Sequence, residues 1–222
     1  MNNCKTYRAI WHDVVRGKQN GNCQTTHHPT EKIEQIEFVL NNLNCQRGHE
    51  ILELFSGRGN LTDIYKKYGN VTECDRKYKK TGDSYLLYHK LIYEKKKYTV
   101  IDLDPYGFPC RLFPDIFLLI DKGILFVTMP KPSVNILNKI TQIHLISYFG
   151  EQNPSEKVVA DRIVLWGLSH WRKVELIDVV DLKSVWRFAF GVEKVKATDY
   201  TGIKNQPDEE TRRRDTAQSR LF

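Results

Sequence analysis

The chain has 222 residues, which is enough for one α/β domain with a full core. Its formal net charge is +7, and no apolar run reaches the ~18 residues that a membrane span needs. The first residues, "MNNCKTYRAIWHD", lack the apolar core of a signal peptide, and the five cysteines form no CxxC pair. We therefore expect a cytoplasmic protein with free thiols, and neither a membrane protein nor a disulfide framework.

The positive charge is concentrated between Lys66 and Lys97, where ten Lys and Arg residues accompany only four Asp and Glu residues. Tyrosines interleave with these charges at Tyr68, Tyr78, Tyr85, Tyr88 and Tyr93. Cations attract phosphates, and aromatic rings stack on bases. A solvated helix face would explain any single lysine, but the cluster as a whole predicts a polyanionic partner such as RNA or DNA.

The hydrophobic pattern predicts helices and strands that alternate along most of the chain. Thr30 is expected to cap the first helix, while Gly69 and Gly123 are expected to end two later helices. In chain order the predicted elements are a helix at 30–43, a strand at 50–55, a helix at 60–69, a strand at 70–74, a helix at 84–96, a strand at 98–104, a helix at 112–123, a strand at 124–129, a helix at 156–170 and strands at 173–182 and 184–195.

This alternation predicts a doubly wound, mostly parallel sheet with helices on both faces. The last two strands are joined by a connection too short for a parallel crossover, so they should form an antiparallel hairpin. We expect an irregular segment at 1–28, one folded domain at 29–200, and a flexible charged tail at 201–222.

A glycine loop, "ELFSGRGN", lies between the strand at 50–55 and the next helix. Gly57 and Gly59 permit a tight turn and a close ligand approach. The loop lacks the third glycine of GxGxxG and the GK[ST] ending of a phosphate-binding loop, so a dinucleotide site is disfavoured. It resembles the first motif of class I S-adenosylmethionine (SAM) methyltransferases, although a purely structural glycine turn is the alternative. That resemblance implies a Rossmann-like, seven-stranded-type sheet and a cofactor loop formed by Glu53, Phe55, Ser56, Gly57, Gly59 and Asn60.

Acidic residues follow the next strand, at "TECDRK" and "TGDSY". Asp75 is placed to accept hydrogen bonds from ribose hydroxyls, with Glu73 as the competing candidate and an ordinary surface acid as the simpler reading. Asp83 could bind the adenine amino group or could equally cap the following helix.

The segment "VIDLDPYGFP" delivers Asp104, Pro105, Tyr106 and Gly107 to the carboxyl end of a strand, where α/β sheets bind ligands. It resembles the [DNS]-P-P-[YFW] loop of methyltransferases that act on the exocyclic amino groups of bases. A base amino group is a poor nucleophile because its lone pair is delocalised into the ring. The Asp104 carboxylate and the Pro105 carbonyl could accept hydrogen bonds from its two N–H groups and aim the lone pair at the methyl of SAM. Tyr106 would stack on the base, which must leave its helix or loop.

Two further resemblances refine the family. The segment "HHPTEK" is similar to the HPTQK segment of DNA amino-methyltransferases, which opens a helix lining the SAM pocket; His28, Pro29, Thr30 and Lys32 match, and Glu31 replaces the glutamine. The stretches "DLDPYG", "GILFVTM" and "SVWRFAFGV" resemble the tRNA guanine-N2 dimethyltransferase family, whose loop reads DPFG. This likeness covers roughly residues 28–195. The chain lacks the length for that family's additional C-terminal domain and an obvious DNA target-recognition domain.

These resemblances imply a SAM-dependent N-methyltransferase that acts on nucleic acid and releases S-adenosyl-L-homocysteine. RNA is slightly preferred as the substrate, and DNA adenine-N6 or cytosine-N4 methylation is the alternative. A non-catalytic nucleic-acid-binding module with this fold is a further alternative, and a small-molecule or protein methyltransferase is a third. Without a recognition domain, the chain could need a homodimer or a partner subunit.

Two other constellations are weaker. Cys23, His27, His28 and Cys45 do not have the spacing of a known zinc site. Cys110 follows Pro109, as a methyl-accepting cysteine nucleophile would, but Asp104 already occupies the strand end. We therefore predict no metal centre.

Overall fold

The computed structural model describes residues 29–42, 48–76, 82–105, 107–132 and 139–196. The segment at 1–28, the tail at 201–222, and the predicted site residues His28 and Tyr106 lie outside these residues, as do all four candidate zinc ligands. Among the described residues no group of three or more His, Cys, Asp and Glu side chains is placed to hold a metal ion. No described helix is long and apolar enough to cross a membrane.

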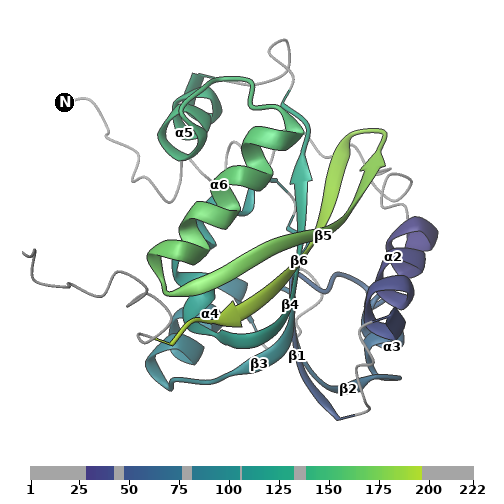
Figure 1. The fold of residues 1–222 in the computed structure, drawn as a ribbon. Helices are drawn as coiled ribbons and strands as arrows, with labels where there is room; N and C mark the ends of the chain where they lie inside the picture. The colour runs from purple at the N-terminus through teal and green to yellow at the C-terminus, as the bar shows by residue number, and fades with distance from the viewer. Residues whose placement is uncertain (1–28, 43–47, 77–81, 106, 133–138, 197–222) are drawn as a thin grey trace, which may run out of the picture.

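Six strands form one sheet in the order β2-β1-β3-β4-β6-β5 (Figure 1). Their bounds are His49–Leu54 for β1, Gly69–Cys74 for β2, Tyr98–Leu103 for β3, Ile120–Pro130 for β4, Arg172–Leu182 for β5 and Val185–Lys194 for β6. The first four strands are parallel, and β6 is antiparallel to both of its neighbours, β4 and β5. The predicted mostly parallel sheet with a terminal hairpin is confirmed, with six of the expected seven strands in the described residues.

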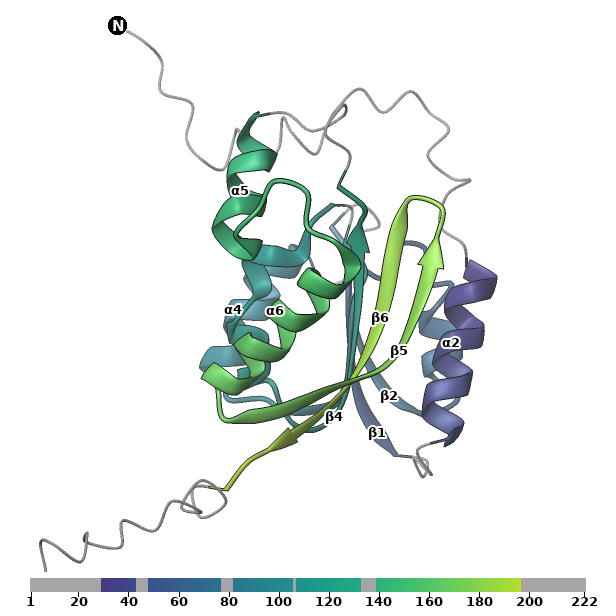
Figure 2. The same cartoon turned by 45° about the horizontal axis from the view of Figure 1, so that its top comes forward.

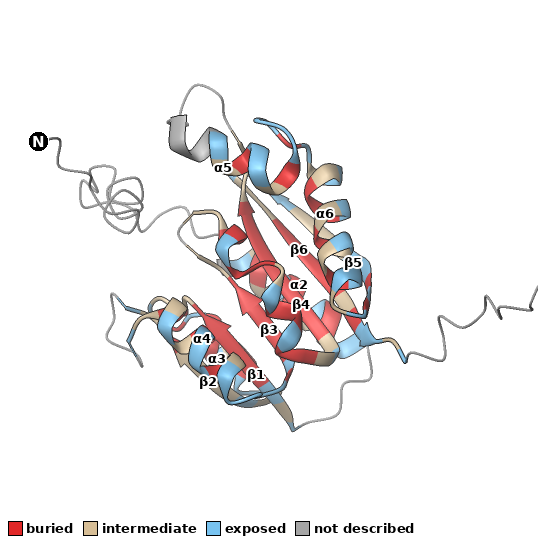
Figure 3. Ribbon diagram, turned by 90° about the vertical axis from the view of Figure 1, so that its left-hand side faces the viewer, coloured by how far each residue is buried: buried red, intermediate tan, exposed pale blue. Residues whose placement is uncertain are grey.

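Helices cover both faces of the sheet (Figures 1 and 2). Helices α2 (Pro29–Asn42) and α3 (Thr62–Tyr65) lie on one face, and α4 (Ser84–Tyr93), α5 (Lys139–Phe149) and α6 (Glu156–Ser169) lie on the other. Each face has its own apolar core, and the central strands are buried on both faces, as Figure 3 shows. Double burial explains why the positions 51–54 of β1, 100–103 of β3 and 124–129 of β4 are all buried and do not alternate with exposed residues.

Three local predictions are wrong. The first helix begins at Pro29 and not after a cap at Thr30, because proline's fixed φ suits the first turn of a helix. The helix expected at 60–69 is only the short α3. The helix expected at 112–123 is replaced by two 3₁₀ turns, Pro109–Leu112 and Asp115–Leu118, followed by β4.

The break at 112–123 has a local cause. Pro114 has no N–H and disfavours a helical residue before it, so an α-helix cannot run through this segment. Gly123 lies within β4 and ends no helix. Glycine is needed at this position because a Cβ would overlap the Thr99 carbonyl oxygen of β3.

Candidate functional site

The first three parallel strands end at the same level. Leu54 of β1 is the register partner of Cys74 in β2 and of Leu103 in β3. The residues that follow these strand ends, Phe55, Asp75 and Asp104, therefore emerge side by side along one edge. This is the edge at which the sequence places its glycine loop, its ribose-binding acid and its DPYG loop.

The glycine loop adopts backbone conformations that suit its residues. Gly57 and Gly59 have φ values of 55° and 93°, in the left-handed region that favours glycine. Phe55 also has a positive φ of 72°, which is strained for an aromatic residue. Asn60 is exposed, whereas Ser56 is buried and its Oγ has no hydrogen-bond partner among the described residues. A buried hydroxyl without a partner is costly unless a ligand or water satisfies it.

The acid after β2 holds the glycine loop. The Asp75 carboxylate accepts a hydrogen bond from the Gly57 N–H at 3.0 Å. The competing acid, Glu73, instead lies 3.3 Å from Thr62 Oγ1, a hydroxyl that makes its shorter hydrogen bond to Glu53. Asp83 caps α4 by accepting hydrogen bonds from the N–H groups of Tyr85 and Leu86, so the predicted capping role is confirmed. An adenine contact for Asp83 stays a prediction.

Glu53 is a buried carboxyl group beside this loop. Glu53 belongs to β1, and Thr62 Oγ1 donates a hydrogen bond to its carboxyl group at 2.5 Å. Burial raises the pKa of Glu53 to about 8, the Thr62 bond only partly offsets this, and the negative charge of Asp102 adds to it. Glu53 is therefore mostly protonated at neutral pH.

Asp104 is held by Lys32 of α2. The Lys32 Nζ lies 2.8 Å from Oδ1 and 2.6 Å from Oδ2, so the ammonium donates to both carboxylate oxygens. Lys32 is 5 % exposed and Asp104 is 21 % exposed, which leaves the carboxylate as the accessible partner. Burial alone would raise the pKa of Asp104, but the charges of Lys32 and Arg187 and hydrogen bonds from Lys32 and Thr128 lower it below its usual value. Asp104 is therefore ionised.

Beneath Asp104 lies a fully buried ion pair. Arg187 of β6 binds Asp102 of β3 through two nitrogens at 3.1 and 2.8 Å, and both side chains are 0 % exposed. Arg187 also donates to Thr128 Oγ1 at 2.9 Å, and the Tyr65 hydroxyl donates to Asp102 at 2.7 Å. Thr128 and Arg187 both lower the pKa of Asp104, so this buried cluster favours the ionised carboxylate.

The sequence did not assign a role to Lys32 or to Arg187. Lys32 belongs to "HPTEK" and Arg187 to "VWRFAF", two segments that resemble methyltransferase motifs, and no local pattern gives either residue a partner. A signal was present in Asp102, an acid inside an otherwise apolar strand, which requires a buried cation. The sequence alone does not identify this cation. The strand order does, because β6, which contains Arg187, lies two strands away from β3.

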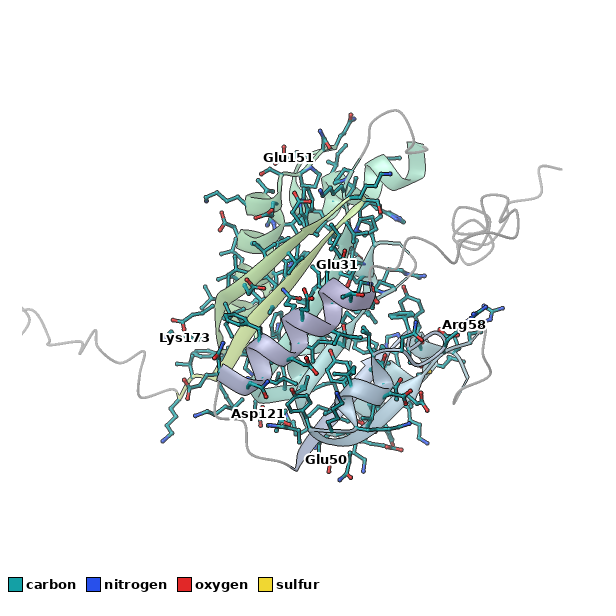
Figure 4. The ribbon with its side chains drawn as sticks, turned by 90° about the vertical axis from the view of Figure 1, so that its right-hand side faces the viewer. Glu31, Glu50, Arg58, Asp121, Glu151 and Lys173 are labelled. Carbon is teal, nitrogen blue, oxygen red and sulfur yellow. The ribbon has the colours of Figure 1, made fainter. Side chains whose placement is uncertain are left out.

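The described residues of the basic segment between Lys66 and Lys97 do not form one surface. Arg76 follows the carboxyl end of β2, whereas Lys66 precedes β2 and Lys96 precedes β3, at the opposite edge of the sheet. Figure 4 shows this polarity, with Arg58 and Glu31 toward one end of the sheet and Glu50 and Asp121 at the other.

The tyrosines of that segment also differ. Tyr88 is 1 % exposed and donates to the Leu112 carbonyl, so it is a core residue and cannot stack on a base. Tyr93 is 87 % exposed. Tyr85 packs edge-to-face on Phe55 of the glycine loop, at 5.7 Å between ring centres, with the Arg111 guanidinium 5.6 Å from its ring.

Cys110 does not fit the nucleophile reading. It is 3 % exposed, and burial raises its pKa to about 12, so the thiolate that attacks a ring carbon is not available.

No family model matches the chain, and no curated protein matches it. Solved structures do. Magnesium protoporphyrin IX methyltransferase (ChlM) from Synechocystis PCC 6803 with bound SAM is 11 % identical, with 86 % of this chain and 99 % of that chain covered and a TM-score of 0.51. Trm1 from Pyrococcus horikoshii with S-adenosyl-L-methionine is 14 % identical, with coverage of 76 % and 56 % and a TM-score of 0.49.

A putative SAM-dependent methyltransferase from Streptococcus mutans is 12 % identical, with coverage of 71 % and 48 % and a TM-score of 0.48. The chain thus spans about half the length of the first structures that it matches. The match to ChlM, which aligns nearly the whole of that enzyme, shows the fold: the chain has the Rossmann-like fold of SAM-dependent methyltransferases.

Proposed function

We propose that this chain is an enzyme that transfers a methyl group from SAM to an exocyclic amino nitrogen of a base in nucleic acid. The observation that carries the proposal is the position of Asp104. An ionised, partly exposed carboxylate follows β3, level with and next to the glycine loop that follows β1. In the proposed reaction, Asp104 would accept from the target amino group beside the loop that would hold the methyl donor.

The residues of the glycine loop fit SAM. Gly57 and Gly59 leave the backbone open, and the buried Ser56 Oγ offers a hydrogen-bonding group that has no described partner. Asp75 would accept from the ribose hydroxyls, and Glu53 would ionise to hold the methionyl ammonium. When bound, SAM supplies an electrophilic methyl whose bond to sulfur breaks as the bond to nitrogen forms, leaving S-adenosyl-L-homocysteine.

The Asp104 loop would activate the acceptor. Its carboxylate and the Pro105 carbonyl accept hydrogen bonds from the two N–H groups of the base amino group, which localises the nitrogen lone pair. Gly107, with φ 116°, lets the chain turn away beneath the base, and Tyr106 is assigned to stacking from the sequence alone. Because the pKa of Asp104 is lowered, we assign the proton that nitrogen loses to water and not to this carboxylate.

We propose RNA as the preferred substrate, on the resemblance of DPYG and "VWRFAF" to the tRNA guanine-N2 family. The second candidate is DNA methylation at adenine-N6 or cytosine-N4. One contact favours it: Lys32, a matching residue of the DNA-type HPTEK segment, binds Asp104 directly.

The deciding experiment is parallel transfer of tritiated methyl from SAM to total tRNA, rRNA and unmethylated genomic DNA. Nucleoside analysis of the labelled product then names the base and the atom. Calorimetric titration with S-adenosyl-L-homocysteine tests the cofactor separately, and no binding would refute the reading of the glycine loop.

The variant Asp104→Ala should abolish transfer and keep the affinity for S-adenosyl-L-homocysteine. If the wild-type chain binds both the cofactor and nucleic acid without any turnover, the non-catalytic binding module is the correct reading. If Asp104→Ala retains full transfer, the assignment of the acceptor carboxylate is wrong.

We also propose a cellular compartment and an assembly state. The described cysteines, Cys74 and Cys110, are free thiols, which supports a reducing cytoplasm. A homodimer or a partner subunit would supply the grip on nucleic acid that a separate recognition domain otherwise gives. Light scattering with and without RNA tests this.

A further inference from the structure

We propose that Lys32 is a positioning residue: it keeps hold of one oxygen of Asp104 during methyl transfer, while the target amino group takes the other oxygen. This inference rests on the proposed function and extends it to a residue on a different element. Lys32 and Asp104 are 72 residues apart in sequence, and α2 brings them together.

The geometry sets up a competition. Both oxygens of Asp104 now accept from the one ammonium, at 2.8 and 2.6 Å. The base amino group needs one of them, and it approaches from the side on which Asp104, but not Lys32, is exposed. A carboxylate has about four acceptor positions, so it can serve the lysine and the base together.

Helix α2 keeps Lys32 in reach. Three positions along the helix, Gln35 donates to Asp178 of β5 at 2.8 Å and to the Arg187 carbonyl of β6 at 3.1 Å. Its apolar residues Ile36 and Leu40 are fully buried against the sheet. Because the helix is anchored in this way, Lys32 can yield one oxygen by side-chain rotation without losing the other.

No other described cation can take this role. The groups that act on Asp104 are Lys32 from α2, Arg187 from β6, the Thr128 hydroxyl from β4 and Glu53 from β1. Arg187 is committed to Asp102, and Glu53 is mostly neutral below pH 8. Among the described residues only Lys32 forms a salt bridge with Asp104, so its loss removes the ammonium that holds both carboxylate oxygens and raises the pKa of Asp104.

The test compares Lys32→Met with Lys32→Arg. Lys32→Met should lower kcat by tenfold to a hundredfold, roughly the effect of misplacing a reacting group by about 1 Å, with little change in KM for SAM. Its acidic limb in the pH profile of kcat/KM should move to higher pH. Lys32→Arg, which keeps the charge and can bind both oxygens, should keep most of the wild-type rate and should leave the acidic limb at its wild-type pH.

Two controls separate positioning from folding. Lys122→Met removes an exposed lysine of β4, paired with Glu193 at 3.5 Å and far from the site, and should match the wild type. Arg172→Met removes another buried cation, which pairs with Asp121 at the opposite edge of the sheet, and should lower stability without moving the acidic limb. A ¹³C titration of the Asp104 carboxyl in the free protein, assigned with Asp104→Asn, gives the pKa without any turnover.

The outcomes are distinct. A wild-type rate and an unmoved limb in Lys32→Met overturn the positioning role, and a faster rate shows that Lys32 only obstructs the acceptor. If the wild-type chain methylates no nucleic acid, the proposed function fails. The carboxyl titration then still decides whether Lys32 controls the charge of Asp104.

Discussion

Glu53 and Asp104 are two carboxyl groups near the same strand ends whose pKa values move in opposite directions. Glu53 has one hydroxyl donor and acidic neighbours, so burial raises its pKa to about 8. Asp104 has an ammonium on both oxygens and Arg187 nearby, so its pKa is lowered despite burial. At neutral pH the site therefore contains one neutral and one charged carboxyl group, and each can take a different role.

The raised pKa of Glu53 predicts a pH dependence of stability. The folded state keeps a proton on Glu53 that the unfolded state releases between the ordinary pKa of 4.5 and the raised pKa of about 8, so the free energy of unfolding should fall as pH rises through this window. Glu53→Gln stays neutral and can still accept from Thr62. Urea denaturation should find the variant close to wild type at pH 5 and more stable at pH 9; equal pH dependence in both proteins would contradict the burial argument.

The Asp102–Arg187 pair predicts strong coupling between two substitutions. Arg187→Met leaves Asp102 buried and unpaired, and should lower the free energy of unfolding by about 3–5 kcal/mol. The double variant Arg187→Met with Asp102→Leu removes both charges and should recover much of that loss. A double-mutant cycle by urea denaturation measures the coupling, and simple additivity would mean that the two charges do not depend on each other.

Among single residues, the sequence identified chemistry that local context reveals. Asp104 and the loop glycines stand at predicted strand ends, where a ligand edge is expected. Lys32 and Arg187 could not be given partners, because contacts across 72 and 85 residues leave no trace in a local pattern. The sequence left a capping role and an adenine contact open for Asp83; the structure shows the cap, and the adenine contact stays a prediction.

At the scale of elements, close approach between strands explains one error of prediction. Gly123 was expected to end a helix, but it lies in β4 with φ 154°, against the Thr99 backbone of β3. The apolar run around it fits a buried strand and a buried helix equally well, since periodicity alone does not separate them. The alternation that predicts the sheet is more reliable, because it depends on many elements and not on one.

Gly123→Ala should therefore destabilise the sheet. Its methyl group would overlap a backbone carbonyl, which cannot move without separating β3 from β4, so we expect a loss of about 2–4 kcal/mol, in the range of disruptive core substitutions. The matched control is Gly48→Ala, where φ is 113° and a Cβ would meet nothing within 4 Å. Thermal and urea unfolding of both variants separates the overlap from backbone strain, and equal losses would refute the overlap.

For the whole molecule, the division of charge between the two sheet edges matters more than the net charge of +7. The proposed site lies at the edge that carries Arg58 and Arg76, whereas Lys66 and Lys96 lie toward the other edge. Only the first pair is placed to contact the phosphates of a strand whose base enters the site.

Salt dependence of RNA binding tests this division. Arg58→Ala and Arg76→Ala should each reduce the slope of log affinity against log salt concentration by about one, because each removes roughly one phosphate contact. Lys66→Ala and Lys96→Ala make the same change in charge and should leave the slope as in the wild type. Fluorescence anisotropy at four salt concentrations is sufficient, and equal effects from all four variants would indicate non-specific attraction.

The sheet order also has a consequence for synthesis on the ribosome. The last strand in sequence, β6, lies inside the sheet between β4 and β5, and it brings the only described cation that pairs with Asp102. A nascent chain that has already made β1 to β4 therefore exposes one long edge of β4 and contains a buried carboxylate without its counter-charge. Chains emerge N-terminus first, at about 5–20 residues per second. The four-stranded intermediate therefore gains the counter-charge of Asp102 and a partner for the edge of β4 only after residues up to 194 have been made.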